Sequence, residues 1–196
     1  MVSNQDLIKA VFDDDVMKRN KWFFIADWKK AEIIELETES KVLKVKNIIW
    51  YNGIWKYGLW KNGTWINGTW EYGTWHNGSW KKGTWENGYW ENGTWENGTW
   101  EDGTWYNGSW KSGIWESGYW YNGTWKSGTW EKGWWYNGIW EKGTWENGSW
   151  KNGKWIDGLW RKGDWYSGKI FDSKTKKYIN STVPPNKCKW SLSYGK

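Results

Sequence analysis

The sequence predicts an all-β protein, a single-chain β-solenoid with Trp inside, and two observations carry this prediction. Trp occupies every fifth position from Trp50 to Trp165, 24 times without interruption. Gly follows three residues behind each of these Trp residues, from Gly53 to Gly168. A fixed short period indicates that one structural unit is copied and stacked.

The period of five residues favours short strands separated by turns. It matches neither the 3.6-residue period of a helix nor the two-residue period of a long strand. The residue before Trp is mostly Thr, with Ser, Ile, Leu or Tyr elsewhere, and these types favour strands. Asn-Gly, Asp-Gly, Ser-Gly and Lys-Gly pairs supply the turns.

Two arrangements follow from such units: a short-strand antiparallel meander built from hairpins, and a solenoid that turns a corner at each Gly. Gly is present in all 24 repeats, whereas the residue before it is Asn in only 12 and Lys or Tyr in several others. A type I′ hairpin turn needs positive φ at both residues, while a type II turn needs it only at the second. One obligatory Gly corner therefore favours the solenoid.

The residues before Trp suggest about four pentapeptides per coil. Leu59, Tyr119, Ile139 and Leu159 share one phase of a 20-residue period, and Ile54, Ile114 and Trp134 share its neighbour. Another phase is mostly Thr, namely Thr64, Thr84, Thr104, Thr124 and Thr144. On this period, 24 repeats make six coils.

The unit Gly-Thr-Trp-Glu-Asn, as it stands at residues 93–97, resembles the pentapeptide-repeat proteins. That resemblance implies a right-handed, four-sided β-helix in which a small residue and, two places later, a large apolar residue point inward, as Gly63 and Trp65 would here. The sequence departs from that family by placing Trp where Leu or Phe is usual and Gly where Ala is usual. The Trp/Gly pentads also show a fainter likeness to repeats in tail-associated proteins of bacteriophages.

The periodic Trp residues are expected to form the core. A buried Trp removes about 150–250 Å² from water, and that many exposed indoles would cause aggregation. The predicted core runs the length of the repeats and is represented by Trp50, Trp75, Trp100, Trp125, Trp150 and Trp165.

Flanking segments are expected to cap both ends of the solenoid, which spans residues 50–169. Residues 1–49 form an N-terminal α+β cap, with a short helix through Phe12 and strands at residues 22–28, 31–37 and 41–49. In the C-terminal basic cap or tail, residues 170–196, Ile170 and Phe171 are expected to pair with Tyr178 and Ile179, and Pro184-Pro185 ends the regular structure. Open strand edges at the ends of a solenoid need such covers.

Charge is spread in a way that disfavours nucleic acid as a partner. The net charge is +6, and the tail alone carries six Lys against one Asp. No basic stripe follows the repeats, which a nucleic-acid-binding rod would need. An acidic strip from Glu86 to Asp102 is expected to be solvated surface. The sequence contains no transmembrane run and no signal peptide, so a cytoplasmic or virion-associated location is expected.

Catalytic groups are scarce, and we do not expect an enzyme, a cofactor or a metal site. The single His, His76, and the single Cys, Cys188, are far apart in the sequence. No Cys/His spacing typical of metal sites and no phosphate-binding Gly loop is present.

Three functions remain as hypotheses. The first is a non-catalytic rigid scaffold or attachment element in a larger assembly, with a phage particle as the candidate. The second is a carbohydrate-binding module using exposed Tyr with neighbouring Asn and Glu, although Tyr51, Tyr106, Tyr121, Tyr136 and Tyr166 fall in all four 20-residue phases. The third is ice or surface binding through the Thr column.

The apolar residues before Trp are the candidate partner-binding stripe, because an outward apolar row usually marks a contact surface. We expect the stripe to lie on two adjoining sides of the rod and to dock against a protein partner or a second copy of the chain. Its members are Leu59, Ile114, Tyr119, Trp134, Ile139 and Leu159.

Overall fold

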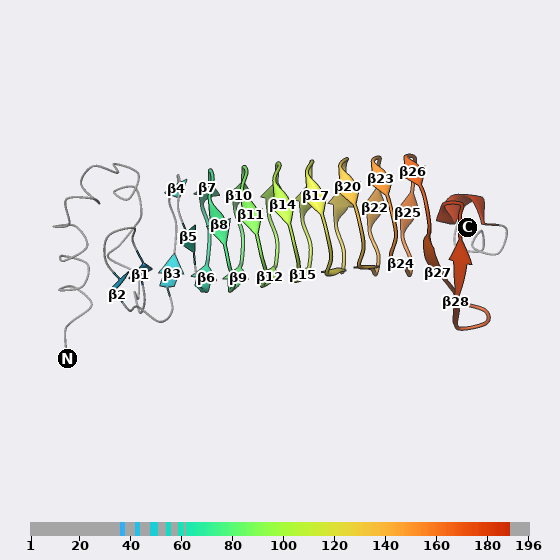
Figure 1. The fold of residues 1–196 in the computed structure, drawn as a ribbon, viewed down its shortest axis with the longest axis horizontal. Helices are drawn as coiled ribbons and strands as arrows, with labels where there is room; N and C mark the ends of the chain where they lie inside the picture. The colour runs from blue at the N-terminus through green and yellow to red at the C-terminus, as the bar shows by residue number, and fades with distance from the viewer. Residues whose placement is uncertain are drawn as a thin grey trace.

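The computed structural model describes residues 62–188 continuously, together with the five short strands at residues 36–37, 42–43, 48–50, 54–55 and 59–60. The described repeats form a β-solenoid whose coils stack along one axis (Figure 1). Leu36–Glu37 (β1) and Val42–Leu43 (β2) pair in an antiparallel manner. The predicted N-terminal helix and the rest of the predicted N-terminal cap lie outside the described residues.

Three sheets form the sides of the rod, and each takes one parallel strand from every coil; the β3 sheet also contains the antiparallel strand β28. The β4 sheet contains Ile54–Trp55 (β4), Thr69–Trp70 (β7), Thr84–Trp85 (β10), Thr99–Trp100 (β13), Ile114–Trp115 (β16), Thr129–Trp130 (β19), Thr144–Trp145 (β22) and Leu159–Trp160 (β25). The β5 sheet contains Leu59–Trp60 (β5), Thr74–Trp75 (β8), Tyr89–Trp90 (β11), Thr104–Trp105 (β14), Tyr119–Trp120 (β17), Trp134–Trp135 (β20), Ser149–Trp150 (β23) and Asp164–Trp165 (β26). The β3 sheet contains Ile48–Trp50 (β3), Gly63–Trp65 (β6), Ser79–Trp80 (β9), Thr94–Trp95 (β12), Ser109–Trp110 (β15), Thr124–Trp125 (β18), Ile139–Trp140 (β21), Lys154–Trp155 (β24), Gly168–Asp172 (β27) and Lys177–Ser181 (β28).

The register between strands sets three pentapeptides per coil, so the predictions of about four per coil and six coils are wrong. Thr84 pairs with Thr99 and Trp85 pairs with Trp100, which is a step of three pentapeptides along the chain. The same step recurs in the other two sheets, for example between Trp90 and Trp105. Every strand pair within the repeats is parallel, which excludes the antiparallel meander.

Backbone hydrogen bonds join each coil to the one before it. In the coil that contains Trp100, the Thr99 N–H donates to the Gly83 carbonyl at 3.0 Å and the Glu101 N–H donates to the Trp85 carbonyl at 2.8 Å. The corner Gly residues from Gly63 to Gly163 all have positive φ, between 114° and 137°. The prediction that Gly is obligatory at the corner is thus confirmed, because L side chains rarely adopt such φ values.

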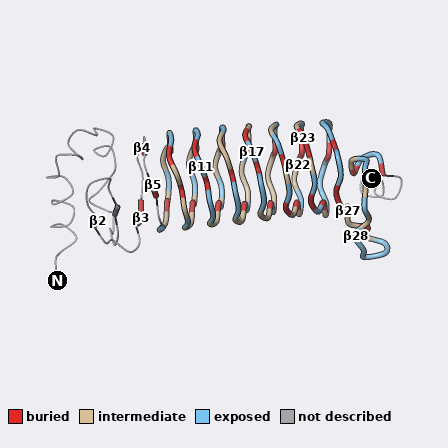
Figure 2. The backbone as a smooth tube through the Cα atoms, viewed as in Figure 1, coloured by how far each residue is buried: buried red, intermediate tan, exposed pale blue. Residues whose placement is uncertain are grey.

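The interior is made of Trp. All six representative core residues are buried, from Trp50 at 2% exposed through Trp100 at 0% to Trp165 at 9%, and the buried positions recur along the tube in Figure 2. Trp100 stacks on Trp85 and Trp115 of the adjacent coils, with ring centroids 4.8 Å apart in both cases. Within the winding it meets Trp95 and Trp105 edge to face at 6.0 and 5.9 Å. Three files of parallel indoles, meeting edge to face, therefore fill the three-sided interior.

Ring packing rather than indole hydrogen bonding holds most of this core together. Near the C-terminal end, the Trp135 Nε1–H donates to the Asn152 carbonyl and the Trp140 Nε1–H donates to the Asp157 carbonyl, both at 3.1 Å. Among the described residues, the buried indole N–H groups at every fifth position from Trp60 to Trp130 have no hydrogen-bond partner. The chain tolerates these groups because each indole from Trp65 to Trp130 contacts four other indoles, and Trp60 contacts three.

The C-terminal segment closes one end of the β3 sheet. β28 pairs with β27 in an antiparallel manner, with Ile170 opposite Ile179 and Phe171 opposite Tyr178, as the sequence predicts. In the connecting turn, the Asp172 carboxylate accepts hydrogen bonds from the Thr175 hydroxyl and the Lys174 N–H, and these bonds lower its pKa. Regular structure continues slightly beyond the expected stop, since Pro185–Lys187 forms a short 3-10 helix (η3).

Candidate functional site

The outward positions of the solenoid lie immediately before and after each buried Trp. Side chains alternate between the two faces of a strand, so both neighbours of an inward Trp point away from the core. Residues three pentapeptides apart occupy the same place on successive coils. Each sheet therefore carries two outward files, and their composition defines what each side of the rod can bind.

The predicted partner-binding stripe is not a stripe in the structure. Its members lie on all three sheets rather than on two adjoining sides: Leu59, Tyr119 and Trp134 on the β5 sheet, Ile114 and Leu159 on the β4 sheet, and Ile139 on the β3 sheet. The expectation fails because it assumed a 20-residue coil. Only Tyr119 and Trp134 are direct neighbours, paired in register between β17 and β20.

Three tyrosines that the 20-residue period separated lie together. Tyr106, Tyr121 and Tyr136 directly follow the Trp residues of β14, β17 and β20. The rings of Tyr106 and Tyr121 stack with centroids 5.3 Å apart, and those of Tyr121 and Tyr136 stack at 4.8 Å. The prediction that these tyrosines are scattered is wrong. Tyr51 lies outside the described residues.

The tyrosine file continues toward the C-terminal end through Lys151 and Tyr166. The Lys151 ammonium lies over the Tyr166 ring, with Nζ 3.4 Å from the centroid, and also 4.9 Å from the Trp134 centroid. Cations at such positions are attracted by the ring quadrupole. Lys151 thus bridges the two outward files of the β5 sheet.

Together these side chains form an aromatic face on the β5 sheet, which we define as Tyr106, Tyr119, Tyr121, Trp134 and Tyr136. Tyr119 is 46% exposed, Trp134 39% and Tyr121 42%. Between Thr104 and Asn137, the residues that directly flank the Trp residues of this sheet carry no charge. The sequence signal that could have found this face is the spacing of its Tyr residues, which is three pentapeptides.

An asparagine file borders the aromatic face at the corner that follows it. Its seven members are exposed and lie one coil apart: Asn62, Asn77, Asn92, Asn107, Asn122, Asn137 and Asn152. Within the described part of the chain, none of their carboxamides makes a hydrogen bond. Asn87 and Asn97, at other corners, instead accept the N–H of the following Gly.

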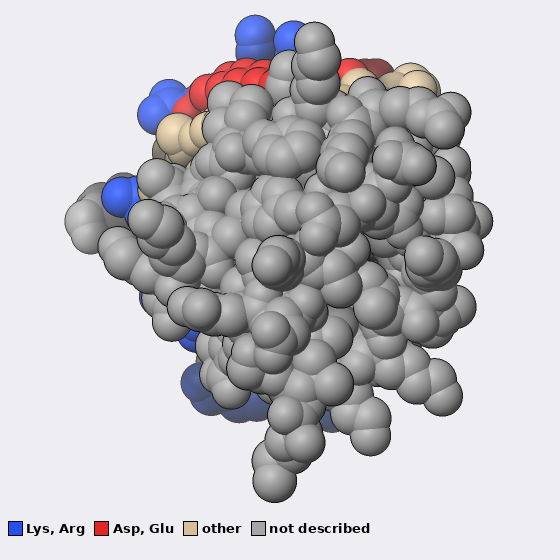
Figure 3. All heavy atoms as spheres, turned by 90° about the vertical axis from the view of Figure 1, so that its left-hand side faces the viewer, with Lys and Arg blue, Asp and Glu red and all other residues tan. Residues whose placement is uncertain are grey.

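A glutamate file follows the Trp residues of the β4 sheet from β7 to β22, and Arg161 follows Trp160 of β25. Six Glu residues follow one another at one-coil spacing: Glu71, Glu86, Glu101, Glu116, Glu131 and Glu146. Partial burial and the neighbouring carboxylates of Glu101 and Glu71 raise the pKa of Glu86. Figure 3 shows acidic side chains gathered in one band of the visible surface. The acidic residues from Glu86 to Asp102 are mostly exposed, as expected, but they do not form one strip, because Glu91 lies on the β5 sheet and Glu96 on the β3 sheet.

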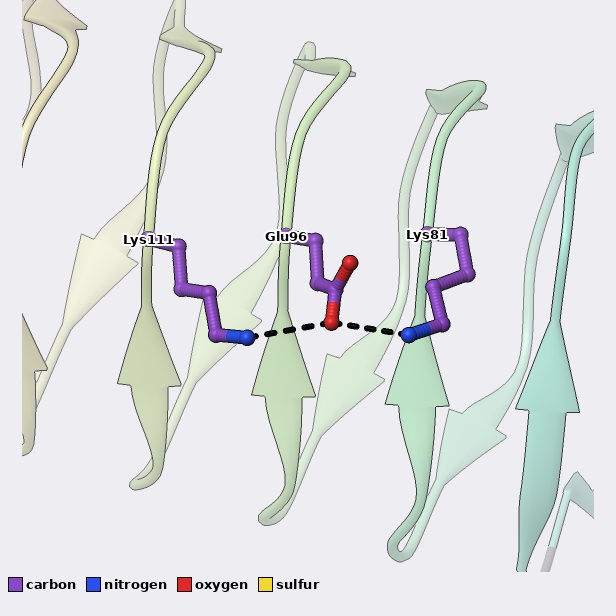
Figure 4. Close-up of polar contacts among 3 residues, drawn as sticks. All are labelled: Lys81, Glu96 and Lys111. Carbon is purple, nitrogen blue, oxygen red and sulfur yellow. Dashed lines mark hydrogen bonds and ion pairs between the residues drawn. The ribbon is translucent and has the colours of Figure 1, made fainter.

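Oppositely charged neighbours surround Glu96 on the β3 sheet. The Glu96 Oε1 atom accepts hydrogen bonds from Lys81 Nζ at 2.9 Å and Lys111 Nζ at 3.0 Å, one from each adjacent coil (Figure 4). The hydrogen bond from Lys81, reinforced by that from Lys111, lowers the pKa of Glu96. The two Glu residues at equivalent coil positions, Glu86 and Glu96, thus have opposite pKa shifts.

Glu101, which lies beside the Glu86 carboxylate, and Glu96, which lies between two Lys residues, should respond in opposite ways when their charge is removed. Glu101→Gln should raise the free energy of unfolding at pH 7 by about 0.2–0.5 kcal/mol, because it removes like-charge repulsion from the file. Glu96→Gln should lower it by a similar amount. Thermal unfolding at low salt measures both effects, and both should shrink at 1 M salt. A stabilising Glu96→Gln, or a destabilising Glu101→Gln, would contradict the electrostatic account.

The pH dependence has opposite signs for the two carboxyls. Glu86 has a raised pKa in the folded state, so its contribution to stability is greatest below its ordinary pKa of 4.5 and is lost as pH rises through the raised value. Glu96 has a lowered pKa, so its contribution is present above the ordinary value and is lost as pH falls through the lowered one.

The structure separates the two candidate reactive side chains. His76 follows β8, where its Nδ1 contacts the Glu91 carboxylate of the next coil. Cys188 is buried after η3, which packs against β25 near the opposite end of the rod (Figure 1). In the described ranges, no three His, Cys, Asp or Glu side chains form a group that could hold a metal ion.

No protein-family model matches this chain. No curated protein and no solved structure matches it either. Among the residues described, no helix has the length and apolar character needed to span a membrane. The regular five-residue repeat and the stacked coils are consistent with pentapeptide repeats.

Proposed function

We propose that this protein is a non-catalytic rigid rod that acts as a spacer or attachment element in a larger assembly. The observation that carries the proposal is the continuous Trp interior, in which every coil repeats the same stacking. Trp75 stacks on Trp60 at 4.7 Å and Trp135 stacks on Trp150 at 4.8 Å, far apart along the rod. Such an interior resists bending because any bend would open the stacks on one side.

The surface supports the same function. The core positions are nearly invariant, whereas the outward files differ from side to side, so the rod presents different chemistry in different directions. The likeness of the pentads to Trp/Gly repeats of bacteriophage tail-associated proteins makes a phage particle the candidate assembly. A cytoplasmic or virion-associated location fits this role.

The arrangement of the Thr residues gives little support to ice or surface binding. Thr64 and Thr124 lie on the β3 sheet, Thr84 and Thr144 on the β4 sheet, and Thr104 on the β5 sheet, so the predicted column does not exist. A different Thr file follows the β4 sheet, but Ile114 interrupts it and the glutamate file lies beside it. Because Glu side chains lie beside this Thr file, the β4 sheet does not present the regular array of neutral groups that such binding needs.

Removing one whole coil tests the rod directly. Deleting residues 94–108 keeps every outward file in register, so the protein should fold and shorten by about 4.8 Å. Deleting residues 94–107 leaves one extra residue at the corner between Trp90 and Trp110, so it should destabilise the rod at that junction. Small-angle scattering and thermal unfolding measure both results. Equal stability of the two deletions would contradict the stacked-coil rod.

The scaffold role itself is tested in the native source. Cross-linkers placed at Lys81, in the repeats, and at Lys174, in the turn between β27 and β28 beyond the last repeat, should capture assembly components in particles that sediment with the protein. A protein that stays monomeric in extracts, without cross-links at either position, would overturn the scaffold function while leaving the rod structure intact.

A further inference from the structure

The geometry points to a binding site for a neutral, extended carbohydrate chain that lies along the aromatic face and the adjoining asparagine file. This inference goes beyond the scaffold role and does not depend on it, since a rod without such a site would still separate two partners. Its basis is the repetition of aromatic and amide groups at one-coil spacing.

The aromatic face offers two kinds of apolar contact. The rings of Tyr106, Tyr121 and Tyr136 stack on one another, so they present their edges and hydroxyl groups outward. In contrast, Tyr119 stacks on no other ring among the described residues and is 46% exposed. The C–H faces of sugar rings pack against aromatic rings, and phenol hydroxyls both donate and accept hydrogen bonds.

The asparagine file supplies polar groups of the right kind beside this face. Each carboxamide has two N–H donors and one carbonyl acceptor, which matches the donor and acceptor capacity of sugar hydroxyls. Asn107, Asn122 and Asn137 directly follow the three stacked tyrosines. Their carboxamides make no hydrogen bond within the described chain, whereas the Asn97 carboxamide is already engaged by Gly98. The file is thus free to bind a ligand.

Charge selects a neutral glycan over a nucleic acid. A polyphosphate ligand needs a row of Lys or Arg beside the stacking rings. Here the central part of the face is uncharged, and in the tyrosine file Glu91 precedes it and Lys151 follows it. The glutamate file lies on the β4 sheet on one side, and Lys111 and Lys126 lie on the β3 sheet on the other. The face itself therefore lacks the row of cations that a polyphosphate needs, whereas a neutral sugar needs none.

The period of the face indicates a polymer rather than a single sugar. The paired strands β14, β17 and β20 repeat the same ring and carboxamide, and the stacked Tyr rings are 4.8–5.3 Å apart. A chain running parallel to the rod axis meets these groups in succession. Many weak contacts along one ligand then act together.

The test uses the full chain on an array of neutral oligosaccharides of one to eight units, with single-stranded DNA as a separate probe. Binding should grow with oligosaccharide length and should not occur with DNA. The double variant Tyr119→Thr/Tyr121→Thr should raise the Kd for the best oligosaccharide at least tenfold. Asn122→Ser should raise it severalfold. Thr before Trp and Ser at the corner are residues that this chain already carries at equivalent positions in its coils.

Matched controls occupy the same coil positions on another sheet. Lys126 follows Trp125 in the same way that Tyr121 follows Trp120, so Lys126→Thr is the control for the tyrosine variant. Asn97 stands before a corner Gly, as Asn122 does, so Asn97→Ser is the control for Asn122→Ser. Neither control substitution should change the Kd. Thermal unfolding of each variant tests whether it folds. The proposal is overturned if no neutral oligosaccharide binds, if DNA binds instead, or if the double variant binds as tightly as the parent. Self-association of the parent that the double variant abolishes would also overturn it, because a second copy would then occupy the face.

Discussion

Replacing Gly98 with Val is expected to unfold the coils around it, at a cost of more than about 4 kcal/mol. Gly98 has φ of 127°, which β-branched residues rarely adopt. A Cβ atom there would also overlap the Gly83 carbonyl oxygen of the preceding coil and lie 3.2 Å from Cζ2 of Trp95. The neighbouring backbone cannot withdraw without breaking the hydrogen bond from Thr99 to Gly83.

The adjacent substitution Asn97→Ser is the matched control. The Asn97 Oδ1 atom accepts the Gly98 N–H at 2.9 Å, and loss of this exposed bond should cost about 0.5–1 kcal/mol. Ser already occupies this corner site at Ser112, Ser117, Ser127 and Ser167. Urea unfolding followed by circular dichroism compares the two variants. Equal destabilisation would show that the corner depends on both residues, which the single positive φ excludes.

The features that the sequence predicts well are those that the backbone and the core enforce in every repeat. Gly98 and its equivalents must have positive φ, and Trp100 and its equivalents must be buried, so neither position varies. The hairpin between Ile170 and Tyr178 is also predictable, since apolar pairs flank a polar turn. These constraints are local, and they hold for any number of sides.

The number of sides was predicted wrongly because the prediction used positions that the fold does not constrain. The described residues before Trp point outward, so apolar residues such as Tyr119, Ile139 and Leu159 can recur at every fourth pentapeptide by chance. The residues after Trp carry a stronger signal. Glu recurs at every third pentapeptide from Glu71 to Glu146, and Asn does so from Asn62 to Asn152. That period gives three pentapeptides per coil.

The candidate site was missed for the same reason. Tyr106, Tyr121 and Tyr136 are three pentapeptides apart, so a coil of four pentapeptides placed them on different sides. Correcting the coil length brings them into one stack and brings Trp134 beside Tyr119. An error of one pentapeptide in the coil therefore changes every inference about the surface, while it leaves the core unaffected.

Replacing Trp100 with Ala is expected to lower the free energy of unfolding by about 3–5 kcal/mol. Trp100 is fully buried and contacts four other indoles, two stacked and two edge to face. The cavity lies in mid-rod, where neighbouring backbone strands are held by hydrogen bonds on both sides and cannot collapse into it. Urea unfolding of parent and variant, followed by circular dichroism, gives the difference.

Trp134→Ala is the control for this prediction, because it removes the same side chain from the outer surface. Trp134 is 39% exposed and its contact with Lys151 is a surface one, so the loss should stay within about 0.5 kcal/mol. Iodide should quench little of the parent's Trp emission, which should be blue-shifted, since the indoles of the three core files are shielded from water. Strong iodide quenching, or equal destabilisation by the two substitutions, would mean that the periodic Trp residues face solvent. The stacked interior would then be wrong, and with it the physical basis for a rigid rod.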